Sequence, residues 1–127
     1  MKILIDSNVL LWLVYSPSRI GPKTTSFIKE AENTCVSCVS LWELAIKFNI
    51  GKLPHSPKII SNEVGQAGLE IMPLNQRHIE RLTQIKLPQK DPFDRMLLAQ
   101  SESEAYIFLT ADKQILNSPY NTLNISA

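Results

Sequence analysis

The sequence has few of the features that would direct a chain of 127 residues to a membrane, to a zinc site or to a nucleic acid through its overall charge. Its 13 basic and 12 acidic side chains leave a net charge of +1, so no global positive field attracts a polyanion. The apolar stretch Val9–Val14 is too short to span a membrane, and Asp6 comes too early for a signal-peptide core. We therefore expect a cytoplasmic protein without a membrane segment, in which any site for a polyanion is local.

Cysteine and histidine are also scarce. Cys35 and Cys38 form a single C-x-x-C motif, and the two histidines, His55 and His78, are distant from it in the sequence. A zinc site needs a second pair of ligands at a defined spacing, which this sequence lacks. We interpret the two cysteines as small residues of a strand rather than as a metal or redox site.

The composition, with 44% hydrophobic and 20% charged residues, is typical of one globular domain, and we assign residues 1–127 to it. Short apolar segments alternate with helical patterns along the whole chain. The expected strands are residues 2–5, 34–38, 69–73, 106–110 and 121–126, and the expected helices are about 8–15, 24–32, 40–49, 58–67, 75–85 and 91–104, with a helical turn at 111–117. The expected fold class is therefore α/β, with a mostly parallel central sheet of about four or five strands and helices on both faces.

Four acidic residues occupy similar places in this expected fold. Asp6 directly follows the first strand, and Asp112 comes two residues after the fourth. Glu43 and Asp94 fall in the first turns of two helices. The carboxyl ends of parallel strands lie at one edge of a sheet, where ligands bind near a topological switch point. We therefore expect these four side chains to lie close together at that edge.

Each acid also has a purely local interpretation. Aspartates are common caps at helix starts, and capping alone would account for Asp6, Asp91 and Asp112. Asp94, in the first turn of its helix, would complement the helix dipole. Glu43 could be the reciprocal partner of Ser40 in an S-x-x-E capping box. Capping does not explain, however, why several acids should gather at one edge of a sheet.

Acids that gather in this way need a counter-charge. Carboxylates about 5 Å apart repel one another by roughly 3 kcal/mol per pair at an effective dielectric constant near 20. Protonation or a hard divalent cation relieves this repulsion, and an all-oxygen site suits Mg²⁺ or Mn²⁺. One or two such ions would attract phosphate oxygens and polarise a water molecule for in-line attack on a phosphodiester.

Four segments together carry a resemblance to a known family. They are ILIDSNVLLWL near the start, SCVSLWELAIKFNIGKL in the middle, KDPFDRMLLAQS, and FLTAD near the end. In this order and spacing the sequence resembles the PIN-domain ribonucleases, especially the VapC toxins of toxin-antitoxin pairs. The resemblance runs over nearly the whole chain, so it implies a single PIN domain over residues 1–127.

The resemblance also implies an activity and a site. Its acidic quartet, Asp6, Glu43, Asp94 and Asp112, would hold Mg²⁺ or Mn²⁺ for endonucleolytic cleavage of single-stranded or loop RNA. The products would carry a 5′-phosphate and a 3′-hydroxyl, which agrees with in-line attack by water. An antitoxin protein would occlude the acidic cleft, and a homodimer or a larger toxin-antitoxin assembly would form through apolar helix faces.

Five further residues match the family pattern less strongly. Asp91, the extra acid of the D-P-F-D-R form, is better explained as a helix cap and a support for the ligands. Ser7, Asn8 and Thr110 would orient ligands or water by hydrogen bonds. Arg95 could contact a phosphate, although a solvated arginine on a helix face is an equally good interpretation, and Lys47 and Lys52 leave the same choice open. The chain departs from many relatives in having no histidine at residues 87–90.

Two other functions remain open from the sequence. A non-catalytic PIN-like binding module would use the same scaffold to hold RNA or a protein partner, with its acids serving as caps. The intact quartet argues against this alternative. A phosphoacceptor or phosphatase site at Asp6 would need a D-x-D pair, which Asn8 interrupts.

Overall fold

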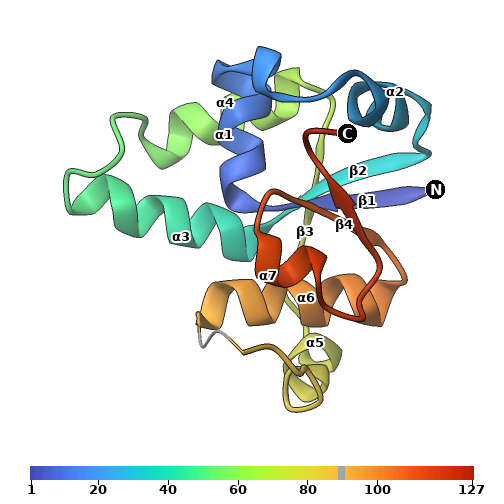
Figure 1. Cartoon of the computed structure of the whole chain (residues 1–127). Coiled ribbons are helices and arrows are strands. Elements are labelled where there is room, and N and C mark those ends of the chain that lie inside the picture. The colour runs from blue at the N-terminus through green and yellow to red at the C-terminus, as the bar shows by residue number, and fades with distance from the viewer. Residues whose placement is uncertain (89–90) are drawn as a thin grey trace.

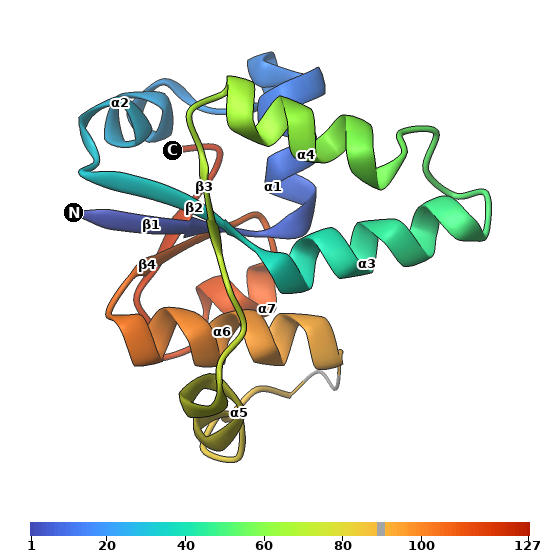
Figure 2. The same ribbon diagram turned by 180° about the vertical axis from the view of Figure 1, so that it is seen from behind.

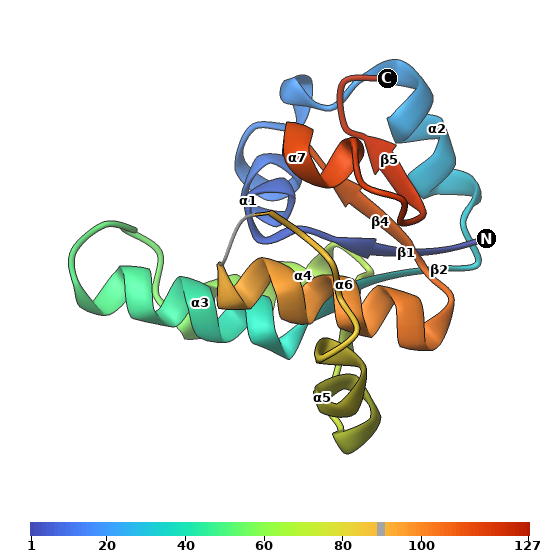
Figure 3. The same cartoon turned by 60° about the horizontal axis from the view of Figure 1, so that its bottom comes forward.

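Five short strands form one parallel sheet in the order β3-β2-β1-β4-β5. The structure is a computed structural model and describes residues 1–88 and 91–127. The strands are β1 (Lys2–Ile5), β2 (Asn33–Ser37), β3 (Glu70–Met72), β4 (Ile107–Thr110) and β5 (Thr122–Asn124). The predicted parallel sheet is thus confirmed, with β3 at one edge (Figures 1 and 2) and β5 at the other (Figure 3).

Helices cover both faces of the sheet, as the sequence predicts. They are α1 (Ser7–Tyr15), α2 (Pro22–Glu30), α3 (Cys38–Asn49), α4 (Pro57–Gln66), α5 (Gln76–Leu82), α6 (Pro92–Glu104) and α7 (Lys113–Leu116), with a 3₁₀ helix, η1, at Pro17–Arg19. In Figure 1, α1, α2 and α4 lie above the sheet, and α5, α6 and α7 lie below it. Helix α3 projects away from the sheet and runs alongside α6 (Figure 3).

The strands explain why two separate cores form. One core lies between the sheet and helices α1 and α4, and it contains Ile3, Ile5 and Leu109. The other lies between the sheet and α6, and it contains Leu4 and Phe108. All five side chains are fully buried. Successive residues of a strand point to opposite faces, so a sheet covered on both sides needs apolar residues at consecutive positions. Each such side chain contributes about 1.5–3 kcal/mol by its burial.

Two local predictions are corrected by the structure. Helix α3 begins at Cys38 rather than near Ser40, because the hydroxyl of Ser37 accepts a hydrogen bond from the N–H of Val39 (3.0 Å) and caps it. The alternative in which Ser40 and Glu43 form a capping box is therefore wrong. The segment between the expected helices 8–15 and 24–32 contains η1, and α2 already begins at Pro22 rather than at residue 24, since a proline is well suited to the first turn of a helix.

The connections place a topological switch point between β1 and β4. From β1 the chain passes to β2 and β3 on one side, then returns to β4 on the other side and continues to β5. Ligand sites of open parallel sheets lie beyond the carboxyl ends of the strands at such a point. No helix within the described ranges is both long enough and apolar enough to cross a membrane. Residues 89 and 90, part of the segment that lacks the family's histidine, lie outside the described residues.

Candidate functional site

A cavity of about 340 Å³ opens at the carboxyl ends of β1 and β4. We call it the acidic pocket. Its lining residues are Asp6, Ser7, Asn8, Trp12, Glu43, Lys47, Asp91, Asp94, Ala111 and Asp112. The structure therefore brings together the four acids of the predicted quartet, and with them Asp91, Ser7 and Asn8.

Asp6 and Asp112 each cap a helix and line the pocket at the same time. One carboxylate oxygen of Asp6, Oδ1, accepts a hydrogen bond from the N–H of Ser7 (2.7 Å), and Oδ2 accepts one from the Thr110 hydroxyl (2.8 Å). Asp112 Oδ1 accepts from the N–H of Gln114 (2.9 Å), while the Asp112 N–H donates to the hydroxyl of Thr110 (3.0 Å). Thr110 thus links the two aspartates, which fits the supporting role predicted for it.

Glu43 reaches the pocket from the second turn of α3. The hydroxyl of Ser7 donates a hydrogen bond to Glu43 Oε1 (2.7 Å) and also lies 2.9 Å from the hydroxyl of Ser40. Lys47, one turn further along the helix, has its Nζ 3.7 Å from Glu43 Oε2. These contacts fasten the start of α1 to α3, so the two acids that follow β1 and β2 are held in one place.

Helix α6 supplies the remaining two acids. Asp91 caps it through hydrogen bonds from the N–H groups of Phe93 (2.9 Å) and Asp94 (3.2 Å), which confirms the predicted cap. Asp94 follows in the first turn, is partly buried and lines the pocket. Trp42 of α3 makes an edge contact with Phe93 (5.1 Å between ring centroids), which packs the start of α6 against α3.

The electrostatic state of the pocket follows from this arrangement. The pKa of Asp94 is raised to about 7, first by burial and then by the charges of the other four acids, Asp6, Asp91, Glu43 and Asp112. Burial likewise raises the pKa of Asp6 to about 6, against the two hydrogen bonds that its carboxylate accepts. The acids therefore repel one another through the pocket, as their predicted convergence requires.

The donors of the pocket fit a hard divalent cation better than a soft one. Its oxygen donors are carboxylates, one hydroxyl and one amide, and no cysteine or histidine lines the pocket in the described part of the chain. As the side chains lie, no group of three or more His, Cys, Asp or Glu residues within 1–88 and 91–127 is arranged to hold a metal ion by itself. The acids share a pocket and an electrostatic field without forming a closed coordination shell.

The lining of the pocket departs from the sequence prediction at Arg95 and Trp12, and it decides the position of Lys47. Arg95 does not line the pocket, because its guanidinium donates to the backbone carbonyl oxygen of Ile85 (2.8 Å) and anchors the segment before α6. Trp12 lines the pocket but is not among the predicted site residues. Its spacing of four residues from Asn8 was the available signal, since residues four apart share a helix face. Lys47, an open choice from the sequence, also lies in the pocket.

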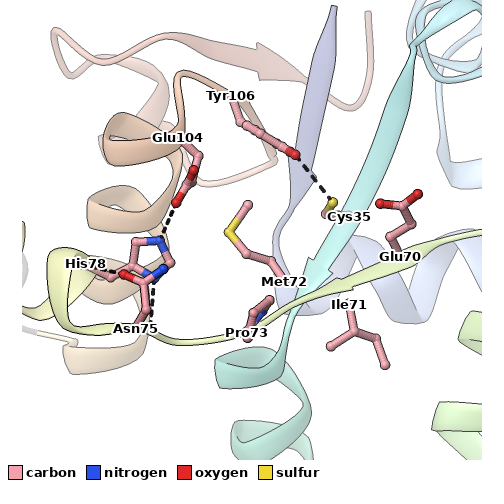
Figure 4. A pocket seen from close by; sticks show the side chains of 9 residues that line it. All are labelled: Cys35, Glu70, Ile71, Met72, Pro73, Asn75, His78, Glu104 and Tyr106. Carbon is pink, nitrogen blue, oxygen red and sulfur yellow. Dashed lines mark hydrogen bonds and ion pairs between the residues drawn. The ribbon is translucent and has the colours of Figure 1, made fainter.

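A second cavity, of about 230 Å³, lies beside the edge strand β3 and is called the β3 cavity here (Figure 4). It is lined by Cys35, Glu70, Ile71, Met72, Pro73, Asn75, His78, Glu104 and Tyr106. The N–H of Asn75 donates to His78 Nδ1 (3.2 Å), so Nε2 carries the proton that it donates to Glu104 Oε1 (3.0 Å). The polar groups of Asn75, His78 and Glu104 are thus bonded in series, which is typical of a structural network.

Comparisons with known proteins agree with the fold. A family model described as PIN domain matches residues 3–118. No curated protein sequence matches the chain at a significant level. Among solved structures, VapBC2 from Rickettsia felis bound to a promoter DNA fragment aligns with a TM-score of 0.73 and 12% identity over 98% of both chains. DNA-bound VapBC from Salmonella typhimurium aligns with a TM-score of 0.71 and 18% identity, again over 98% of both chains.

A third solved structure, VapBC-5 from Mycobacterium tuberculosis, is described as a member of the VapBC family of toxin-antitoxin systems. It has a TM-score of 0.60 and 14% identity over 99% of this chain and 98% of that one. At such low identities these three likenesses show a shared fold.

Proposed function

Since the chain belongs to the PIN domain family, we propose that it is a metal-dependent endoribonuclease and the toxin of a toxin-antitoxin pair. The observation that carries the proposal is the meeting of five acids in the acidic pocket, where four of them raise the pKa of the fifth, Asp94. Such mutual repulsion lowers stability, and strongly perturbed acids in a cleft are typical of functional sites. The likeness to toxin-antitoxin structures agrees with the proposed biological role.

The proposed ligands of Mg²⁺ or Mn²⁺ are Asp6, Glu43, Asp94 and Asp112. When bound, such an ion would offset the repulsion among the carboxylates, attract phosphate oxygens and lower the pKa of a water molecule. The donor set fits this role because it consists of oxygen atoms, and because the acids already lie in one cavity. The acid side chains would have to rotate to close a coordination shell, in keeping with the open arrangement described above.

The residues of this chain would position the reaction rather than carry it alone. Thr110 and the N–H of Ser7 hold both carboxylate oxygens of Asp6, and the Ser7 hydroxyl holds Glu43. Asp91 supports α6 as its cap, and Asn8 offers an amide at the pocket wall. In the overall hydrolysis, the oxygen of water bonds to phosphorus while the bond from phosphorus to the 3′ oxygen breaks. The leaving oxygen gains a proton, so the products are a 5′-phosphate and a 3′-hydroxyl.

The proposed partners are single-stranded or loop RNA, a cognate antitoxin and a second copy of the chain, all in the cytoplasm. A toxin-antitoxin complex from Klebsiella pneumoniae is among the structures with the same fold. Helix α3 and the turn after it expose apolar side chains, among them Trp42 at 60% and Ile50 at 61% exposure. A protein partner that covered these side chains would remove apolar surface from water.

The decisive experiment is cleavage of total cellular RNA by the purified chain, with the ends of the products mapped. We expect cleavage in Mg²⁺ or Mn²⁺ with 5′-phosphate ends, none in excess EDTA, and none from Asp6→Asn in either condition. Binding of RNA or of a protein partner without cleavage under any metal condition would favour the non-catalytic binding module instead.

A further inference from the structure

Arg19 contacts an aromatic residue of the acidic pocket rather than an acid. Its guanidinium carbon lies 4.2 Å from the centroid of the Trp12 ring, and Trp12 lines the pocket. Within the described residues the guanidinium has no hydrogen bond or ion pair, and the residue is exposed. Its five N–H donors are therefore available to a ligand.

Two other cations near the site are already engaged. Lys47 lies 3.7 Å from Glu43, and the guanidinium of Arg95 donates to backbone carbonyl oxygens. A cation on the face of an indole keeps its full charge, because the attraction uses the quadrupole of the ring and not the N–H donors. Arg19 is thus a fixed positive charge with unused donors beside a pocket of carboxylates.

A polyanionic strand that enters the acidic pocket needs such a charge. The carboxylates that line the pocket repel phosphates, whereas a guanidinium at its wall attracts them and can bind two oxygens of one phosphate. Trp12 lies five residues after Ser7 on α1, which places it about 7 Å along the helix axis from the start of the helix. Arg19 would therefore lie to one side of the acids, away from the phosphodiester that the water molecule attacks.

We propose that Arg19 binds a phosphate of the substrate strand next to the scissile one, and that Trp12 positions its guanidinium. This inference rests on the proposed nuclease function, since it names the substrate contact of the same site. It predicts that the strand crosses the wall formed by α1 and η1, and that a minimal diester without a flanking phosphate gains nothing from Arg19.

The test is binding of a short fluorescein-labelled oligouridylate to the Asp94→Asn variant, followed by fluorescence polarisation in Mg²⁺ over a range of salt concentrations. We expect Arg19→Ala in this background to weaken binding about tenfold. A plot of the logarithm of the binding constant against that of salt concentration has a negative slope. Loss of one contact to a phosphate of a single strand should make this slope shallower by about 0.7. The matched control is Arg81→Ala, which removes the same charge from an exposed position on α5. Unchanged binding by Arg19→Ala, or an equal loss in the control, would overturn the proposal.

The role of Trp12 is tested by its own variants in the same assay. Trp12→Phe keeps an aromatic face and should bind almost as the parent does, whereas Trp12→Leu should lose about as much as Arg19→Ala. The double variant should lose no more binding affinity than Arg19→Ala alone, because both changes remove the same contact with phosphate. Additive losses would overturn the positioning role. Trp12 also packs against a core, so the melting temperature of each variant is measured alongside.

The measurement separates this inference from the proposed function because binding does not require cleavage. A specific loss in Arg19→Ala would support the contact even if the wild-type chain cut no RNA. Cleavage by the wild type, together with unchanged binding by Arg19→Ala, would overturn the inference alone.

Discussion

The acidic pocket and the β3 cavity both contain several titratable groups, but their polar contacts differ in kind. In the β3 cavity, fully buried His78 donates to Glu104 and accepts from the backbone of Asn75, so donors and acceptors alternate. In the acidic pocket, carboxylates face carboxylates, and Lys47 is the one basic side chain among the described lining residues. The first arrangement lowers the free energy of the folded chain, whereas the second raises it.

The difference indicates which cavity has a function beyond folding. A satisfied polar network needs no ligand, and removal of one member leaves the others unpaired. A group of like charges costs stability, so it is expected where a ligand of opposite charge or a reaction requires it. Helix capping does not remove this contrast, because Asp6, Asp91 and Asp112 cap helices with one oxygen while still lining the acidic pocket.

The largest expected effect comes from Asp94→Asn in the acidic pocket. This change removes a proposed ligand while keeping the shape of the side chain, so metal-dependent cleavage of RNA should fall about a thousandfold, or about 4 kcal/mol in the activation free energy. Initial rates on a labelled RNA at saturating Mg²⁺ provide the measurement. The matched control is Glu102→Gln, on the same helix but outside the pocket, which should cleave at the wild-type rate. Cleavage by Asp94→Asn at more than a tenth of the wild-type rate would remove Asp94 from the ligand set.

The sequence predicted the sheet and the acids well because both follow from local patterns. Short apolar segments identified the strands, and the residues just beyond their carboxyl ends, such as Asp6 and Asp112, were expected at one edge. The position of a helix start was harder to predict. Both Ser37 and Ser40 precede an apolar helical run, and only the tertiary fold shows that Ser40 is buried against Ser7 and that Ser37 is the cap.

Contacts between distant residues could not be predicted from one sequence. The bonds of His78 to Glu104 and Gln100 join α5 to α6, and neither spacing has a local signature. The contact of Arg19 with Trp12 spans the turn after α1, which the sequence indicated only as a loop. Such contacts depend on the packing of elements, so propensity and periodicity carry no information about them.

The next largest effect is expected from His78→Ala in the β3 cavity. The substitution leaves a void, removes the acceptor of the Asn75 N–H and takes one of two partners from the Glu104 carboxylate, which keeps its contact with Arg77 (3.0 Å). The free energy of unfolding should therefore fall by about 3 kcal/mol. Urea unfolding provides the measurement. The control is Ile79→Ala, the next residue, whose side chain is 51% exposed and whose loss should cost much less. Cleavage per folded molecule should be unchanged in both variants. A loss of activity without a loss of stability in His78→Ala would place the β3 cavity in the function.

A smaller effect is expected from pH. Because the pKa of Asp94 is about 7 in the folded chain, against an ordinary value of 3.8 for an aspartate, the folded state binds more protons between these limits. The contribution of Asp94 to stability is therefore fully present below about pH 4 and is lost as the pH rises through about 7. The whole shift corresponds to about 4 kcal/mol, which solvent screening of this partly buried group reduces to about 2 kcal/mol.

The measurement is the difference in unfolding free energy between the wild type and Asp94→Asn in metal-free buffer, since other groups then largely cancel. At pH 8 the variant should be the more stable by about 2 kcal/mol, and the difference should shrink toward pH 4. Parallel curves of unfolding free energy against pH would show that the pKa of Asp94 is not raised in the folded chain, contrary to its burial among carboxylates.

The smallest effect is expected from Asp91→Ala, which separates capping from catalysis within the D-P-F-D-R segment. Asp91 accepts hydrogen bonds from the N–H groups of Phe93 and Asp94, and loss of a cap costs about 1 kcal/mol of stability. Cleavage should fall less than tenfold, because the quartet keeps its carboxylates. Asp91→Asn, which retains a capping oxygen, should restore most of the stability without changing the rate. If Asp91→Ala instead loses as much activity as Asp94→Asn, then Asp91 acts on the metal or substrate, and the distinction between the capping acid and the reactive acids of the pocket fails at this residue.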